Sequence, residues 1–144
     1  MAEVPGAGGR WKQVHFNVDV MRRFFHLGQN NALSVTLERL DSTGVVAART
    51  SRQLVFSDAN SNSKLEFDFG SAAYPSGDSK PILVAVEASY LTFRYRLVMP
   101  TDPGYQQLGS LLSAGPSVGR GVRRRLVTLD DVESYWPQVN LRGE

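Results

Sequence analysis

The stretch that decides the fold is residues 41–70, DSTGVVAARTSRQLVFSDANSNSKLEFDFG. Apolar and polar residues alternate on both sides of a loop, Ser57 to Lys64, in which almost every side chain can form hydrogen bonds. A hairpin needs only about two to five residues to reverse the chain, so this loop is longer than its turn requires. Arg49 and Arg52 add positive charge on the incoming strand. The loop is therefore a candidate for contacting a partner outside the fold.

The composition predicts one domain with a substantial core. The chain has 144 residues, of which 42% are apolar, and this length suits one domain better than two. The formal net charge is +2 and the sequence pI is about 9.2, which permits a polyanionic partner. Cysteine is absent, which excludes disulfides and thiolate metal sites. No apolar run approaches the roughly 18 residues of a membrane span, and residues 1–6 lack the order of a signal peptide, so we expect a cytoplasmic protein.

Alternating apolar residues predict many short strands joined by few helices. The expected strands lie within residues 11–16, 33–37, 65–69, 82–86 and 91–99. The last two of these are expected to pair as a central hairpin. Residues 1–13 are expected to form a flexible arm, because Pro5, Gly6, Gly8 and Gly9 disfavour regular structure. The pattern is typical of a closed or partly closed antiparallel barrel.

Capping residues predict three short helices. The first begins near Asn17 or Asp19 and runs to Gly28. Asp102 and Pro103 are expected to start the second. The third should begin with a capping box of Thr128 and Asp131, end before Pro137, and bury one face. The residues expected on that inner face are Val132, Tyr135 and Trp136.

Residues that could support catalysis are few. The chain has two histidines, His15 and His26, which sit in amphipathic patterns where a surface or core-edge role is favoured. Glu66 and Asp68 lack the nearby lysine that a metal-dependent nuclease would need, so they are interpreted as the solvent face of a strand. No metal site, cofactor or enzymatic activity is therefore predicted for this chain.

Residues suited to nucleic-acid contact are more numerous. Asn can bond adenine, Asp can accept from cytosine and Lys can donate to guanine, which favours a reading role for the loop residues Asp58, Asn60, Asn62 and Lys64. The arginines Arg123, Arg124 and Arg125 could contact phosphates, although an ordinary solvated segment explains them equally well. Trp11 is expected to cover the core, with contact to nucleic acid beside Arg10 and Lys12 as the alternative.

The order of these segments resembles a known family. The run VHFNVDVMRRFF at 14–25, the strand at 32–37, TSR at 50–52, SAGP at 113–116, RLVTLDD at 125–131 and WP at 136–137 are similar to the N-terminal effector-binding domain of EcoRII-type restriction endonucleases. The resemblance spans most of the chain. It implies a mainly β fold with short helices, the DNA-binding pseudobarrel of about seven antiparallel or mixed strands that plant B3 domains share.

The resemblance also implies a function. Two arms, residues 8–13 and 58–64, would grip the major groove of double-stranded DNA at a short CCWGG-like site. The chain would be a monomeric bacterial specificity module, with a nuclease catalytic domain fused or associated. The predicted DNA-binding residues are Arg10, Trp11, Lys12, Gln13, Arg49, Arg52, Asp58, Asn60, Asn62, Lys64, Arg123, Arg124 and Arg125. The alternatives are a protein-interaction barrel with incidental basic loops, and a small hydrolase or lyase that uses His15 or His26.

Overall fold

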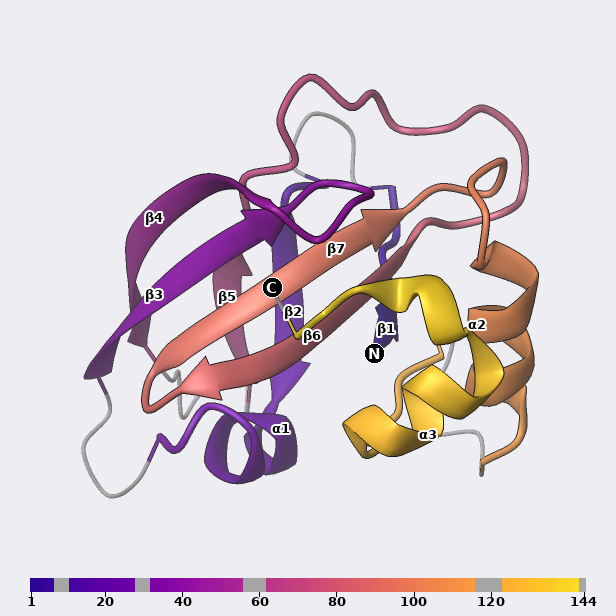
Figure 1. The fold of residues 1–144 in the computed structure, drawn as a ribbon. Coiled ribbons are helices and arrows are strands. Elements are labelled where there is room, and N and C mark those ends of the chain that lie inside the picture. Colours follow the sequence, from indigo (N-terminus) through magenta and orange to yellow (C-terminus); the bar gives the residue numbers. More distant parts are fainter. Residues whose placement is uncertain (7–10, 28–31, 56–61, 116–122, 143–144) are drawn as a thin grey trace.

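A computed structural model describes residues 1–6, 11–27, 32–55, 62–115 and 123–142 (Figure 1). The fold is mainly β with a few short helices, as the alternation predicts. The elements are β1 (Ala2–Glu3), β2 (Gln13–Asn17), α1 (Val18–Arg23), β3 (Ala32–Leu40), β4 (Val46–Val55), β5 (Asn62–Glu66), β6 (Ile82–Ser89), β7 (Thr92–Val98), α2 (Tyr105–Ser113), α3 (Leu129–Tyr135) and a 3₁₀ turn (Pro137–Val139).

The strands form two open sheets. The larger is a mixed five-stranded sheet in the order β1-β6-β7-β3-β4, in which β3 and β7 are parallel and the other neighbours are antiparallel. The expected hairpin of β6 and β7 is confirmed. The smaller sheet pairs β2 with β5. No backbone hydrogen-bond ladder among the described residues joins the two sheets. The hydrogen bonds therefore form two open sheets and do not close the expected barrel.

The chain around the polar loop does not return as a simple hairpin. β5 follows β4 in sequence, but it pairs with β2, from Gln13 opposite Glu66 to Asn17 opposite Asn62. The physical reason is burial, because this pairing brings Val14 beside Leu65 on the face that packs against the five-stranded sheet. The last residues of the expected loop, 62–64, are consequently part of a strand.

Two apolar layers cover the two faces of the five-stranded sheet. The first is rich in aromatic side chains and lies between this sheet and the β2–β5 pair with α1. The second is mainly aliphatic and lies under α2, α3 and the C-terminal segment. Arg94 and Arg96 lie on this second face and contact the C-terminal part of the chain. Arg94 donates to the carbonyl of Arg142, and Arg96 stacks 4.8 Å from the centre of the Trp136 ring.

Residues 1–6 are part of the fold rather than of the expected flexible arm. β1 pairs with β6, with Ala2 opposite Leu83, and Ala2 and Val4 are buried. The Val4 amide donates to the carbonyl of Pro81. The apolar side chains at alternate positions therefore outweigh the effect of the adjacent Pro5 and Gly6. Trp11 is 7% exposed and stacks on Phe69 with 5.0 Å between ring centres, which confirms its expected role in covering the core.

The helix boundaries differ in part from those expected. α1 ends at Arg23, before Gly28. Asp102 caps no helix, because its Oδ2 accepts from the Met99 amide in the preceding turn, and α2 begins after Gly104. The capping box of α3 is confirmed, with the Asp131 amide donating to Oγ1 of Thr128 at 3.0 Å. Trp136 is buried as expected, but Tyr135 is exposed because α3 ends there and turns that ring outward.

Gly104 is required by two constraints at once. Its φ is +89°, in the left-handed region that favours glycine. A Cβ at this position would also lie 2.2 Å from Cε2 of Trp136, so the indole packs directly on the glycine backbone. Gly77 has a similar φ of +98° with nothing within 4 Å of the added Cβ. Substituting Gly77 by alanine therefore introduces backbone strain alone, whereas substituting Gly104 introduces both backbone strain and a steric clash.

We predict that Gly104→Ala destabilises the protein by about 3 kcal/mol or more, the sum of left-handed strain and overpacking of Trp136. Gly77→Ala should cost only the strain, about 1–2 kcal/mol. Urea unfolding followed by tryptophan fluorescence measures both. Equal losses of stability in the two variants would show that Trp136 does not pack on Gly104 as described.

Candidate nucleic-acid interface

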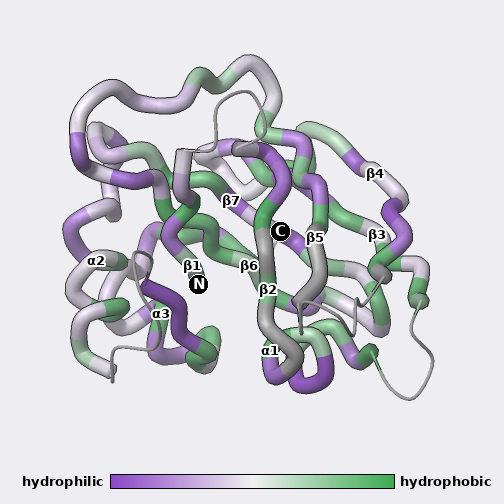
Figure 2. Tube along the Cα trace, turned by 180° about the vertical axis from the view of Figure 1, so that it is seen from behind, coloured by the Kyte–Doolittle hydropathy of each residue, from purple (hydrophilic) through white to green (hydrophobic). Residues whose placement is uncertain are grey.

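The β2–β5 pair is a short two-stranded ribbon with one buried face. Figure 2 shows it in front of the five-stranded sheet, with α1 at one end. Each strand has five residues, which corresponds to a length of about 14 Å at ~3.4 Å per residue. Val14, Phe16 and Leu65 are buried on the side of the core. Because side chains alternate along a strand, the opposite face of the ribbon is turned away from the core.

Gln13 and Glu66 are the described side chains on that outer face. They are cross-strand partners, and Glu66 is exposed while Gln13 is half-buried. Gln13 is among the residues that the sequence predicts for DNA contact. Glu66 is not, because alternation with Leu65 and Phe67 shows only that it faces water. Its position opposite Gln13 depends on the pairing of β2 with β5, for which the sequence gives no local signal.

Cations without acidic partners lie at both ends of the ribbon. At the Gln13 end, Nε of Arg52 donates to the carbonyl of Glu66 at 3.3 Å, and Lys12 immediately precedes β2. At the Asn17 end, Arg22 is exposed on α1. Within the described part of the chain, none of these three cations forms an ion pair. Their charges are therefore available to an external anion.

Arg49 belongs to a different environment, although the sequence groups it with Arg52. Its Nε donates to Oε2 of Glu38 at 2.8 Å, and Nε of Arg94 lies 3.1 Å from the other carboxylate oxygen. Glu38 is only 3% exposed. Burial alone would raise the pKa of Glu38, but hydrogen bonds and charges from both arginines outweigh burial and hold it below its usual value. Arg49 therefore neutralises a buried carboxylate on the far face of the sheet.

The arginines at 123–125 are separated by their contacts. Arg123 forms an ion pair with Glu3 at 3.2 Å and also bonds Ser113. Nη1 of Arg125 donates to the carbonyl of Leu111 at 2.8 Å. The Arg124 side chain is half-buried and bonds no residue that the structure describes. Two of the three guanidinium groups thus already have partners within the fold.

Several predicted site residues fall outside the described residues. Arg10, Asp58 and Asn60 lie in segments that the structure does not describe. Asn62 and Lys64 lie in β5, opposite Asn17 and His15, but only their backbone is described. The DNA contacts expected of these residues stay predictions.

The described residues assemble no cluster suited to a metal ion. No three His, Asp or Glu side chains among them are placed to hold a metal ion. Nε2 of His26 lies 2.9 Å from Oε1 of Glu87, where the pair joins the segment after α1 to β6 at the surface. None of the helices in the described ranges has the length and apolar character needed to cross a bilayer.

Comparisons with protein-family models, curated proteins and solved structures found no match to this chain. The geometry of the chain and the resemblance of its sequence segments are therefore the two grounds for a functional proposal.

We predict that Glu38→Gln destabilises the fold by roughly 2–3 kcal/mol, because a neutral amide compensates two guanidinium groups poorly. The pKa of Glu38 is lower in the folded state than its ordinary value of 4.5. The ionised Glu38 therefore stabilises the fold fully above pH 4.5, and this stabilisation is lost as the pH falls from there through the lowered pKa. The difference in the free energy of unfolding between wild type and Glu38→Gln should therefore become smaller at acidic pH. Urea unfolding between pH 3 and pH 7 tests this.

The matched control is Glu133→Gln, which removes a carboxylate from the exposed pair with Arg142. This variant should unfold close to wild type at neutral pH, since exposed ion pairs contribute little. A Glu38 variant that behaves like this control would show that the Glu38 cluster does not stabilise the fold.

Proposed function

We propose that this chain binds double-stranded DNA sequence-specifically, with the β2–β5 ribbon facing the major groove. The observation that carries the proposal is the ribbon itself, about 14 Å long, with one face buried and unpaired cations at both ends. A major groove is about 12 Å wide and admits a two-stranded ribbon. The ribbon is thus long enough to place cations near the phosphates on both sides of the groove.

The two predicted arms attach to opposite ends of this ribbon. Residues 7–10 lead to Trp11 and then to the Gln13 end of β2, whereas residues 56–61 lead to the Asn62 end of β5. Antiparallel pairing requires this arrangement. Arms that begin at the two ends of a ribbon can approach a duplex from either side, which is the grip that the resemblance to the EcoRII-type and B3 pseudobarrel implies. On this proposal the two open sheets are the two halves of such a pseudobarrel.

Base reading is assigned to the outer face and the arms. The Gln13 amide can form two bonds with adenine, and the Glu66 carboxylate can accept from the amino group of cytosine. Asn60, Asn62 and Lys64 are the corresponding candidates of the second arm. A CCWGG-like site contains both cytosine and adenine, in agreement with these side chains.

Phosphate contacts are assigned first to Lys12, Arg52 and Arg22, because their charges are not neutralised within the described chain. Arg123 and Arg125 would have to leave Glu3 and the Leu111 carbonyl before they could bind a phosphate. Such contacts fix the position of a protein on DNA and supply the salt dependence of binding.

The proposed role is that of a non-catalytic module. The chain would act in the bacterial cytoplasm as a monomer and deliver specificity to a nuclease catalytic domain that is fused or associated. Cleavage would then be the task of that domain. A protein-interaction role is the second candidate function, and it is favoured by an apolar groove on a different side of the molecule, described below.

We predict that Gln13→Ala and Glu66→Gln reduce discrimination between cognate and scrambled duplexes. A lost base contact costs about 1–3 kcal/mol of specificity. The cognate duplex is enriched from a randomised pool by the wild-type chain, with CCWGG sites tested in parallel. Gln107→Ala, on the exposed side of α2, is the control and should keep the full ratio of affinities. If both ribbon variants also keep it, the ribbon does not read bases.

We predict a different effect for the unpaired cations. Lys12→Gln and Arg52→Gln should weaken binding to cognate and scrambled duplexes alike, and each should reduce the slope of log affinity against log salt by about 0.9. Arg49→Gln is the matched control, because its charge serves Glu38, and it should lower stability with little change in the slope. Fluorescence anisotropy over a salt series distinguishes these results. A slope that changes for Arg49→Gln but not for Arg52→Gln would contradict the proposed orientation on DNA.

A further inference from the structure

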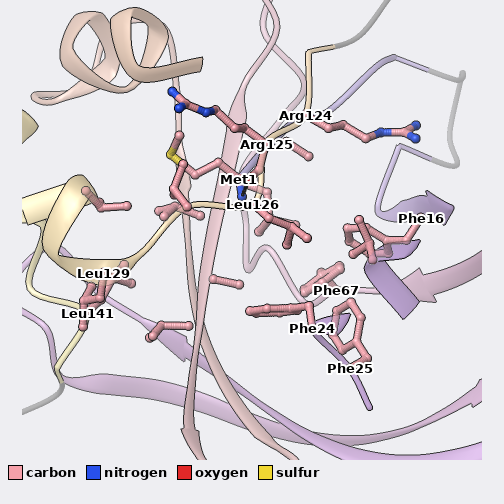
Figure 3. A pocket seen from close by; sticks show the side chains of 18 residues that line it. Met1, Phe16, Phe24, Phe25, Phe67, Arg124, Arg125, Leu126, Leu129 and Leu141 are labelled. Carbon is pink, nitrogen blue, oxygen red and sulfur yellow. Dashed lines mark hydrogen bonds between the residues drawn. The ribbon is translucent and has the colours of Figure 1, made fainter. Parts of the chain in front are cut away.

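An apolar groove lies at one edge of the five-stranded sheet, away from the outer face of the β2–β5 ribbon. Its empty volume is ≈ 770 Å³, including the space that is open to solvent. Figure 3 shows aromatic side chains, among them Phe24 and Phe67, on one side and aliphatic side chains, Leu129 and Leu141, on the other. The aromatic wall comes from β2 and from the segments that follow α1 and β5, and the aliphatic wall comes from α3 and the C-terminal segment.

The groove follows the edge of β6. Residues from both faces of this strand line it, since Leu83 and Ala85 contact the aromatic layer while Val84 and Val86 contact the aliphatic layer. A hollow can touch both faces of a strand only at that strand's edge. β1 covers the edge beside Ile82 and Leu83, and no described strand pairs with residues 84–87 on this side.

This edge combines two properties that proteins usually keep apart. An uncovered strand edge presents unpaired N–H and C=O groups at every second residue, and natural proteins commonly protect it with charged residues, proline or short strands. Here the edge is flanked by two apolar walls instead. An extended peptide satisfies both properties, because its backbone can pair with the edge while its alternate side chains enter the two walls.

The charge at one end of the groove indicates the character of the peptide. Arg124 lies at the Leu83 end of the groove, where its backbone forms an isolated antiparallel β-bridge with Ala2 of β1. Figure 3 shows the Arg124 and Arg125 side chains leaving the rim in opposite directions. Arg125 reaches the Leu111 carbonyl, whereas Arg124 bonds none of the described residues. Burial without a partner disfavours a charged group, so an external carboxylate at this position would be stabilising.

We propose that the groove binds an extended apolar peptide, which adds a strand to β6 and places an acidic residue against Arg124. The inference does not rest on DNA binding, because it uses neither Gln13 nor Glu66. A lipid carboxylate could also fill the walls and meet Arg124, but it has no backbone to pair with the edge. The unpaired edge therefore favours a peptide over a lipid.

The test uses the full chain, labelled with ¹⁵N, and two synthetic apolar hexapeptides of alternating valine and alanine, one with a glutamate at its N-terminal end and one with a glutamate at its C-terminal end. With one of the two peptides, the amides of residues 84–87 should shift and exchange more slowly with solvent. Replacing that glutamate by glutamine should weaken binding about 5-fold or more, since a charge-assisted hydrogen bond contributes more than a neutral one. Methylating alternate peptide nitrogens should abolish binding.

Variants separate the charge from the strand pairing. Arg124→Gln should bind the glutamate and glutamine peptides equally, with the protection of residues 84–87 retained. Lys80→Gln removes a cation that lies outside the groove lining and forms no ion pair with the described residues, and it should keep the preference for glutamate. Retention of that preference in Arg124→Gln would overturn the assignment of Arg124 as the carboxylate contact.

Three results would overturn the proposal as a whole. The first is an absence of shifts at residues 84–87 with any peptide at millimolar concentration. The second is binding of dodecanoate, used as a lipid probe, when the peptides do not bind. The third is concentration-dependent self-association through the same amides, which would assign the groove to a second copy of the chain. None of these outcomes bears on duplex binding, so failure here is distinguishable from failure of the proposed function.

Discussion

Aromatic packing between the two sheets is the interaction on which the rest of the structure depends. No backbone ladder in the described residues joins the β2–β5 ribbon to the five-stranded sheet, so side-chain burial must hold it there. Phe67 packs edge-on against Tyr95 with ring centres 4.9 Å apart, and Phe25 packs against Phe93 at 4.9 Å. Burial of large aromatic side chains in such geometries is strongly favourable. The position of the ribbon, and with it the proposed DNA contact, follows from this layer.

The basic side chains have different partners on the two faces of the five-stranded sheet. On the opposite face of the large sheet, arginines neutralise the buried Glu38 or bond the C-terminal segment. Beside the ribbon, Lys12 and Arg52 have no carboxylate partner in the described chain. A modest net charge of +2 therefore conceals a local difference, because Arg49 and Arg94 are paired with a carboxylate, Glu38, whereas Lys12 and Arg52 have no ion pair in the described chain. Whether a cation can bind a polyanion depends more on its partners within the fold than on how many cations the chain contains.

Local features of this fold could be predicted because they depend on neighbours in sequence. Alternation predicts the β6–β7 hairpin, and the Thr128–Asp131 spacing predicts the capping box of α3. The sequence predicts that Trp11 covers the core, and the structure confirms this. The proposed site was predictable only in part. Gln13 and Arg52 could be selected from residue type, whereas Glu66 could not, since its relevance comes from a partner about fifty residues away in sequence.

The sequence by itself determined most of the strand residues of β3, β6 and β7, and where α3 begins, because short-range periodicity and capping encode these features. Only the tertiary structure decided that β5 pairs with β2, that β3 lies parallel to β7, that the N-terminal residues form an edge strand, and that Arg49 and Arg52 have different roles. Strand pairing is a choice among long-range contacts. That choice depends on which combination buries the most apolar surface, a property that no single segment contains.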